Sequence, residues 1–261
     1  MLAPYKVSER NTVYYTNLTA ENFSFNHSHN PFIQYNRDKQ FRLMINYLKP
    51  SPDDRILCVG VGSGRELEIL SNYVEKLYGV DISEKLLLHC SDKFKGRFDG
   101  CLCNLEKDKT IYDVDYFDKV VCLNVLPYFS KSGMHNFFRE MSRIVQDNGE
   151  LFMFILNAHF PVSEALQKQS LKNRQKYSKP IYYYRPISDY VNVFSRYGFV
   201  VRNAEGGDFY CDINSWFFKY LFNFRWSKLL LRLMDFGGRT TLKRYYRSLY
   251  LTLTNQSYSQ Y

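Results

Sequence analysis

Residues 56 to 64 read Ile-Leu-Cys-Val-Gly-Val-Gly-Ser-Gly, an apolar run that ends in three glycines at alternate positions. An amphipathic stretch follows at once, so the segment predicts a strand, a tight turn and the start of a helix. Glycine lets the backbone approach a ligand closely because it has no Cβ, and the first turn of the helix offers unpaired N–H groups. The segment therefore predicts a nucleotide-type site between a strand and a helix.

The spacing of the glycines separates two kinds of nucleotide site. A dinucleotide-binding turn needs its last glycine at the sixth position, where this chain has Arg65, a side chain too large for that helix to pack against the sheet. A nicotinamide or flavin enzyme is therefore disfavoured. Gly60, Gly62 and Gly64 instead resemble the first motif of class I S-adenosylmethionine-dependent methyltransferases.

A second predicted strand, over residues 76 to 81, ends in an acid. Asp81 follows the glycine turn by about 20 residues, the spacing at which a carboxylate can accept hydrogen bonds from both ribose hydroxyls of a nucleoside. Ser83 and Glu84 then begin a helix. Asp81 is therefore the first choice for a ribose-binding residue, with a solvated or helix-capping acid as the alternative.

The resemblance continues along the chain in the expected order. Residues 101–106 resemble the third-strand motif of the family, 117–126 the fourth, and 148–155 the fifth strand after its glycine turn. Together the motifs cover about residues 40 to 157. They are similar to the small-molecule, quinone-biosynthesis-type methyltransferases, and residues 182 to 201 resemble the penultimate helix and sixth strand of that group.

The resemblance implies a fold and a cofactor. The fold is α/β, a Rossmann-like doubly wound sheet of seven strands, mostly parallel with an antiparallel last strand, plus helical insertions. The cofactor is S-adenosylmethionine, with S-adenosylhomocysteine as its product. The residues that the resemblance places around it are Gly60, Val61, Gly62, Gly64, Asp81, Ile82, Asn104, Leu105, Leu123 and Asn124.

Two positions depart from the family pattern. Cys58 stands where the family usually has an acid that helps to hold the ammonium group of the cofactor, and Asn104 replaces an acid near the adenine amino group. The amide oxygen of Asn104 can still accept a hydrogen bond, whereas a thiol is a poor acceptor and is uncharged at neutral pH. Weaker cofactor binding follows, or an ammonium held by backbone carbonyls alone. A non-catalytic relic that still binds the cofactor is one alternative.

The whole chain, 1–261, is expected to form a single methyltransferase domain. Its parts are an N-terminal helical cap (1–48), a cofactor-binding core (49–157), and acceptor-side insertions or a lid (158–198 and 207–246). We expect a helix up to Tyr197, a strand over Phe199–Arg202 and a last, antiparallel strand over Leu249–Thr254.

Targeting and metal signals are few. The chain has no 18-residue uncharged apolar run and no apolar signal core near its start, so neither a membrane span nor a secretory leader is expected. No pair among the six cysteines has zinc-ligand spacing, and four of them fall in predicted strands, which favours buried thiols and no metal site. A cytoplasmic protein is expected.

The positive charge is concentrated in the C-terminal part. Residues 161–261 hold 16 Lys or Arg against 6 Asp or Glu, whereas residues 1–160 hold 19 against 20. In this fold the C-terminal part covers the acceptor, so an anionic acceptor, an anionic membrane surface or RNA would each fit, as would plain solvation of helix faces. Within it, 216–239 predicts a largely apolar helix that packs as a lid, forms a dimer contact, or lies on a membrane and admits a lipid-linked acceptor.

Transfer of an activated methyl group depends mainly on alignment, and it needs a base only when the acceptor must lose a proton. His159, just past the fifth strand, and Tyr128, after the fourth, are the catalytic candidates. His135 is expected on an outer helix, while His27 and His29 lie in the N-terminal segment.

Residues 124–128, Asn-Val-Leu-Pro-Tyr, also resemble the Asn-Pro-Pro-Tyr motif of enzymes that methylate amino groups in nucleic acids and proteins, with one residue too many. The favoured function is methyl transfer to a hydroxyl or amine of a small hydrophobic or anionic molecule, which could be aromatic. The alternatives are an RNA or lipid-linked acceptor and the non-catalytic relic. RNA is less favoured because no RNA-binding module is visible, and a homodimer stays open.

Overall fold

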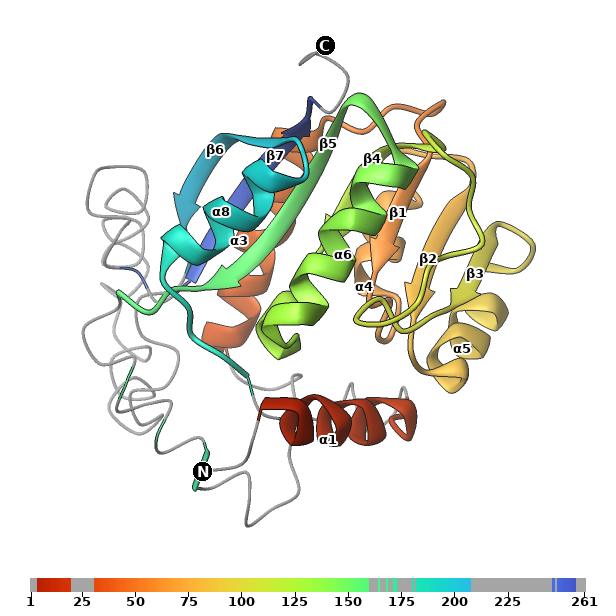
Figure 1. Cartoon of the computed structure of the whole chain (residues 1–261). Helices are drawn as coiled ribbons and strands as arrows, with labels where there is room; N and C mark the ends of the chain where they lie inside the picture. The colour runs from red at the N-terminus through yellow and green to blue at the C-terminus, as the bar shows by residue number, and fades with distance from the viewer. Residues whose placement is uncertain are drawn as a thin grey trace.

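The computed structural model describes residues 4–19, 31–159, 182–207 and 248–256, together with positions 164, 168, 171, 172, 180 and 246. Its centre is a seven-stranded sheet in the order β3-β2-β1-β4-β5-β7-β6 (Figure 1). The strands are β1 Ile56–Val59, β2 Leu77–Asp81, β3 Phe98–Leu102, β4 Phe117–Cys122, β5 Val145–Leu156, β6 Phe199–Gly206 and β7 Ser248–Asn255.

Strands β1 to β5 pair in parallel, and β7 runs antiparallel between β5 and β6. This topology confirms the expected fold, including the antiparallel last strand. Because the strand order reverses beside β1, the carboxyl ends of β1, β2 and β4 form the place where an open parallel sheet binds its ligand.

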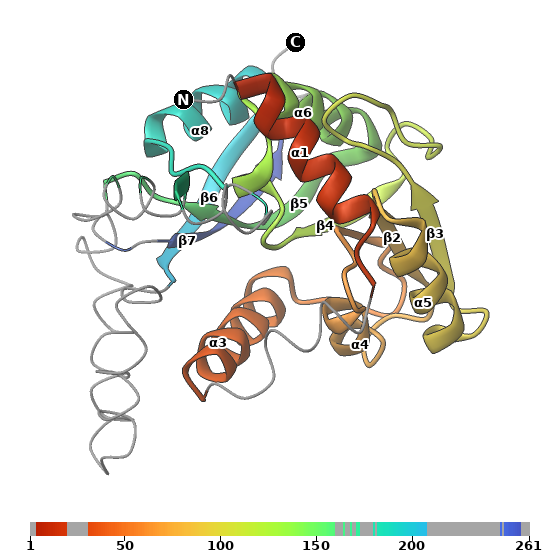
Figure 2. The ribbon, with the colours of Figure 1, turned by 90° about the horizontal axis from the view of Figure 1, so that it is seen from below.

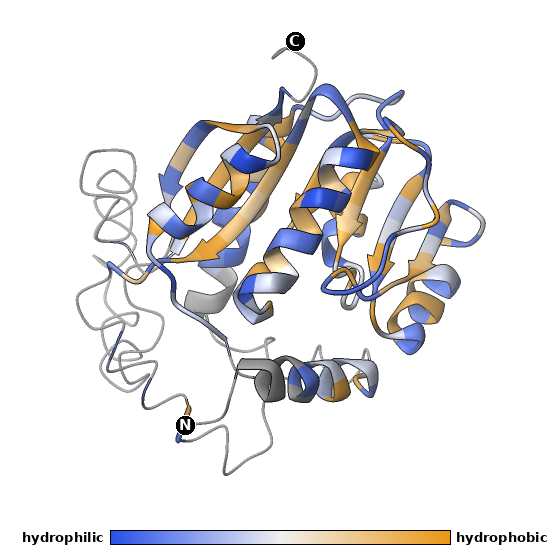
Figure 3. Cartoon of the chain, viewed as in Figure 1, coloured by the Kyte–Doolittle hydropathy of each residue, from blue (hydrophilic) through white to orange (hydrophobic). Residues whose placement is uncertain are grey.

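Helices cover both faces of the sheet. Buried side chains from α3 (Pro31–Leu48), α4 (Arg65–Leu70) and α5 (Glu84–Phe94) form one apolar cluster against the strands, and those from α6 (Lys131–Ile144) and α8 (Ile187–Arg196) form the other. Figure 3 shows largely apolar strands between helices whose polar residues face outward. Burial on both faces explains why the central strands are continuous apolar runs rather than alternating ones.

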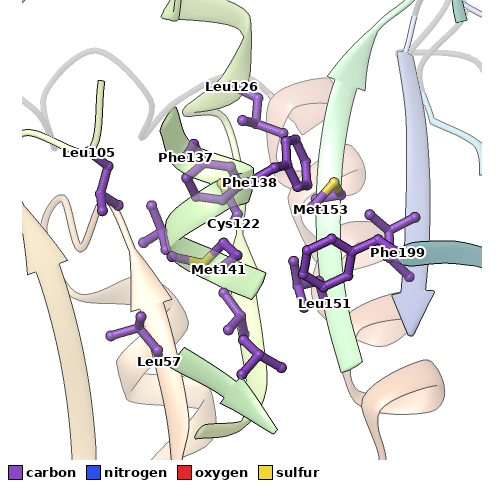
Figure 4. Packing of buried hydrophobic residues seen from close by; sticks show 14 of the residues in the cluster. Leu57, Leu105, Cys122, Leu126, Phe137, Phe138, Met141, Leu151, Met153 and Phe199 are labelled. Carbon is purple, nitrogen blue, oxygen red and sulfur yellow. The ribbon is translucent and has the colours of Figure 1, made fainter. Parts of the chain in front are cut away.

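The packing of α6 shows how the helices are attached to the sheet. Its apolar residues recur every three or four positions, which places them on one face of the helix. Phe138 and Met141 pack among strand residues such as Leu151 and Met153 (Figure 4), and none of these four side chains is exposed. A close-packed core thus holds α6 against the sheet.

Strand β5 begins earlier than the sequence predicts. A glycine turn at Asn148-Gly149 was expected before the strand, yet β5 starts at Val145, opposite Phe117 of β4. The register then shifts, and Glu150 lies opposite Lys119. Asn148 has φ +62°, so the turn signal marks an irregularity within the strand rather than its start.

The N-terminal helix α1 (Pro4–Thr16) crosses the edge formed by the carboxyl ends of the parallel strands (Figures 1 and 2). The Asn11 Nδ2 group donates to the Tyr128 carbonyl at 3.1 Å, and the Ser83 Oγ donates to the Leu18 carbonyl at 3.3 Å. The segment therefore joins the loop after β4 to the loop after β2. It lies across the part of the sheet where the sequence predicts a ligand.

Several expectations concern residues outside the described ranges. These include His27, His29, the apolar stretch 216–239 and most of the insertions 158–198 and 207–246. Over the described ranges, every helix is too short or too polar to cross a membrane.

Candidate functional site

The glycine turn lies between β1 and α4. Gly60, Gly62 and Gly64 have φ values of +73°, +52° and +77°, a left-handed conformation that side chains with a Cβ adopt only at a cost. The Gly60 N–H donates to the Val80 carbonyl at 2.7 Å, which ties the turn to β2. A Cβ on Gly64 would lie 3.0 Å from the Phe94 ring. Backbone conformation and close packing therefore both require glycine here.

Asp81 ends β2 and contacts the glycine turn. Its carboxylate accepts hydrogen bonds from the Gly62 N–H at 3.3 Å and from the Ser83 N–H at 2.9 Å, and the residue is 8% exposed. Burial raises the pKa of the carboxyl group, while the backbone donors of Ser83 and Gly62 act in the opposite direction. The two N–H groups fix the direction of the carboxylate and leave it lone pairs for a ligand.

Asn104 and Leu105 follow β3 on the same edge. The Cys103 N–H donates to the Asp81 carbonyl at 3.0 Å, and the Asn104 Oδ1 accepts from the Glu106 N–H at 3.1 Å. The amide oxygen of Asn104 therefore holds the local turn, and only its second lone pair remains for a ligand.

Five of the predicted cofactor residues differ in how they could contact a ligand. The side chains of Val61, Leu105 and Leu123 are 1%, 4% and 5% exposed and belong to the apolar core, so only their backbone could meet a ligand. Asn124 is exposed, with φ +60° directly after β4, and Ile82 is half-buried after β2. The sheet topology brings the loops that carry these residues to one edge.

A buried acid that the sequence analysis missed holds the third loop to α6. The Glu106 Oε1 accepts from the Ser130 N–H at 2.6 Å and from the Ser130 Oγ at 2.8 Å, while the Asn136 Nδ2 donates to the Glu106 carbonyl at 2.6 Å. Glu106 is 7% exposed. It therefore links the Asn104 loop to the start of α6. Its position two residues after Asn104 was the only sequence signal.

The catalytic candidates lie on different loops. Tyr128 is in the short helix η1 (Leu126–Tyr128), half-buried, with its ring 5.1 Å from Tyr15 and 6.3 Å from Tyr182, both edge to face. His159 is exposed just past β5, and its N–H donates to the Asn157 Oδ1 at 3.0 Å. His135 lies on α6, 3.5 Å from the Tyr197 hydroxyl, which places it against α8 instead.

Arg185 is a second residue that the sequence analysis missed. Its backbone bonds to Leu156 and Ala158 at the carboxyl end of β5, its guanidinium donates to the Phe129 carbonyl, and it stacks over the Tyr183 ring at 4.7 Å. Arg185 is 9% exposed, and its buried Nη1 finds no hydrogen-bond partner within the described ranges. A guanidinium N–H group that is buried without a hydrogen-bond partner is costly, so this position favours a ligand that brings an acceptor.

Metal ligands do not gather in the part of the chain that the structure describes, where no three His, Cys, Asp or Glu side chains lie together. Cys58, Cys101, Cys103 and Cys122 are buried free thiols. All four were expected in strands, but Cys103 lies just after the end of β3.

Residues 57–153, from β1 into β5, match the family model described as "Methyltransferase domain". No curated protein matches the chain.

Solved structures share the fold. One is a methyltransferase from Haloferax volcanii in complex with the Trm112 methyltransferase activator, with a TM-score of 0.61 and 13% identity over 91% of this chain and 97% of that one. An S-adenosylmethionine-dependent methyltransferase from Mesorhizobium loti has a TM-score of 0.58 and 15% identity over 83% and 98%. The N-methyltransferase NodS from Bradyrhizobium japonicum, in complex with S-adenosylhomocysteine, has a TM-score of 0.57 and 12% identity over 97% and 98%. Likeness at such low identity shows the fold.

Proposed function

We propose that this chain, a class I S-adenosylmethionine-dependent methyltransferase, moves a methyl group to a hydroxyl or amine of a small hydrophobic or anionic molecule. The observation that carries the cofactor site is the hydrogen bond from the Gly62 N–H to Asp81, which sets an ionisable acceptor beside a glycine-rich turn. That combination suits a nucleoside whose sugar needs an acceptor and whose other end needs close approach of the backbone.

In this proposal, each group of cofactor-binding residues holds a different part of the ligand. The glycine turn would hold the amino-acid part, Asp81 the ribose hydroxyls, and the loops at Asn104 and Asn124 the adenine and the reacting end. The bound cofactor supplies an activated sulfonium methyl group. The role of the chain is to orient that group and the acceptor and to exclude water between them. His159 or Tyr128 would accept a proton where the acceptor must lose one.

The residues on the side of the site where the acceptor would bind support a hydrophobic or anionic acceptor. Tyr15, Tyr128, Tyr182 and Tyr184 form a row of edge-to-face rings that runs from α1 past η1. Arg185 lies at the carboxyl end of β5, and its buried Nη1 has no hydrogen-bond partner among the described residues. Aromatic faces suit a hydrophobic or planar acceptor, and a buried guanidinium suits a carboxylate or phosphate.

Other acceptors and partners are further proposals. The solved neighbour NodS is an N-methyltransferase, which favours an amine among small acceptors. The methyltransferase complexed with Trm112 adds a protein activator to the candidate partners. Membrane contact through 216–239, an RNA or lipid-linked acceptor, a homodimer, and the similarity to quinone-biosynthesis enzymes rest on the sequence patterns alone.

The test is calorimetric titration of the purified protein with S-adenosylmethionine and S-adenosylhomocysteine, followed by turnover with hydroxyl and amine acceptors. Micromolar binding of both compounds with methyl transfer to one acceptor class supports the proposal. Binding without turnover on any acceptor would favour the relic, and no binding would reject the cofactor site. Asp81→Asn serves as the matched variant with a damaged site.

A further inference from the structure

Ser83 is the N-cap residue of α5, yet its hydroxyl group does not cap that helix. A serine at this position ordinarily accepts a hydrogen bond from an N–H group of the first turn. Ser130 does so at the start of α6, where its Oγ accepts from the Gly133 N–H at 3.0 Å. The Ser83 Oγ instead donates to the Leu18 carbonyl at 3.3 Å. Ser83 therefore holds the N-terminal segment (residues 4–19) rather than its own helix.

Ser83 also contacts the proposed ribose-binding acid. Its N–H donates to the Asp81 Oδ1 at 2.9 Å, and the residue is fully buried. The backbone of Ser83 thus orients the carboxylate, while its side chain fixes the N-terminal segment. One residue therefore connects the position of that segment to the cofactor site.

The N-terminal segment is held in place mainly by polar contacts. The Asn11 Nδ2 donates to the Tyr128 carbonyl at 3.1 Å, and the Tyr15 ring lies 5.1 Å from the Tyr128 ring, edge to face. Among the α1 side chains that the structure describes, only Asn11 is buried. No described residue of 4–19 belongs to either apolar cluster. A segment attached in this way opens at a lower free-energy cost than the core of the protein.

The N-terminal segment lies over the predicted cofactor residues. α1 crosses the carboxyl ends of the parallel strands (Figure 2), and the segment is bonded to Ser83 after β2 and to Tyr128 after β4. Asp81 ends β2, and Asn124 follows β4. A ligand bound between the ends of these two strands would be covered by the segment.

We propose that the N-terminal segment is a gate for the cofactor, held shut by the hydrogen bonds of Ser83 and Asn11. The inference rests on the proposed function, because the ligand that passes the gate is S-adenosylmethionine or S-adenosylhomocysteine. The segment opens to let the ligand in or out, and it closes equally over the free and the occupied site. The gate therefore sets the rates of exchange and leaves the affinity unchanged.

The rates of S-adenosylhomocysteine binding test the gate. Asn11→Leu removes the hydrogen bond to Tyr128. Ser83→Gly removes the bond to Leu18, and glycine is nearly as good as serine at an N-cap, so α5 keeps its start. Each variant should speed association and dissociation by the same factor, about two- to tenfold, which is the effect of losing one hydrogen bond.

Surface plasmon resonance measures the two rates, and calorimetry should give a Kd within about twofold of that of the unsubstituted protein. Val13→Ala is the matched control, because Val13 lies on α1 but is 63% exposed. It should change neither rate. Asn11→Leu keeps the test usable if Ser83→Gly does not fold, since Asn11 lies outside both apolar clusters.

The other outcomes separate the gate from the proposed function. Faster dissociation alone, with a Kd raised by the same factor, overturns the gate, because the segment would then be part of the binding surface. Rates that neither variant changes overturn it as well. If the unsubstituted protein does not bind S-adenosylhomocysteine, the proposed function itself fails.

Discussion

A Cβ atom on Gly60 would lie 2.4 Å from the Cγ2 of Val125, so the glycine turn and the loop after β4 are in direct contact. Gly60→Ala adds this clash to the strain of a side chain at φ +73°. We expect it to lower stability by more than the roughly 1–2 kcal/mol of left-handed backbone strain alone and to weaken S-adenosylhomocysteine binding. Chemical denaturation and calorimetry measure the two effects.

Gly96→Ala is the matched control for that prediction. Gly96 has φ +76°, but a Cβ there would meet nothing within 4 Å, so this variant carries the backbone strain without the clash. In the double variant Gly60→Ala, Val125→Ala, the side chain that the new Cβ meets is shortened, and part of the lost stability should return. Equal losses for Gly60→Ala and Gly96→Ala would contradict the packing argument.

Asp81→Asn should weaken binding of S-adenosylhomocysteine about 10- to 100-fold, because hydrogen bonds to a charged acceptor contribute roughly 1.5–3 kcal/mol. The substitution keeps the shape of the side chain and removes its charge. Calorimetric titration measures the change. Asp99→Asn is the control, because Asp99 lies on β3 and pairs with Lys76 at 3.1 Å. Similar affinities for the Asp81 and Asp99 variants would exclude Asp81 from the ribose site.

The affinity for the cofactor should also depend on pH through Asp81. Burial raises the pKa of this carboxyl group, so its proton returns at a higher pH than on an ordinary aspartate. Binding that needs the ionised form is therefore complete well above the raised pKa and is lost as the pH falls through it. Titrations of S-adenosylhomocysteine from neutral to acidic pH should show this decline, and Asp81→Asn should lack that component. A profile shared by both proteins would assign the decline to other groups.

The sequence predicted the parts of the molecule that depend on local pattern. The glycine turn was found because a positive φ and close packing restrict those positions to glycine, and β2 was found because an apolar run ends in Asp81. The order of strands and helices along the chain then predicted the parallel sheet, because strands joined by helices can pair in only a few ways.

The features that the sequence did not predict depend on contacts between residues far apart in the chain. Glu106 and Ser130 are 24 positions apart, and Asn11 meets Tyr128 across 117. No local pattern marks such pairs, and Arg185 likewise looks like any surface arginine until β5 and η1 enclose it. The early start of β5 was missed because Asn148-Gly149 is a strong turn signal that pairing with β4 overrides.

His159→Ala should lower turnover with little change in affinity for S-adenosylhomocysteine, if His159 accepts a proton from the acceptor. General-base catalysis typically contributes about 10²- to 10⁴-fold, so the loss should be large at neutral pH. His135→Ala is the control, since His135 lies on α6 against Tyr197 and away from the predicted acceptor side. Undiminished turnover across the pH range would reject His159 and leave Tyr128 as the next candidate.

Glu106→Gln should destabilise the fold by roughly 1.5–3 kcal/mol, because a buried carboxylate that accepts from the Ser130 N–H and Oγ becomes a neutral amide. The link between the Asn104 loop and the start of α6 is then weakened, with the Asn136 bond to the Glu106 carbonyl kept, so affinity for the adenine end of the cofactor should fall as well. Urea denaturation and titration with 5′-methylthioadenosine measure the two effects. Glu84→Gln, at an exposed position in the first turn of α5, is the control for removing one acid.

Gly133→Ala should act in the same direction as Glu106→Gln, since its Cβ would lie 2.3 Å from the Glu106 Oε1 and displace it. If both variants were as stable as the Glu84 control, the link between the two loops would not be what holds Asn104 in place.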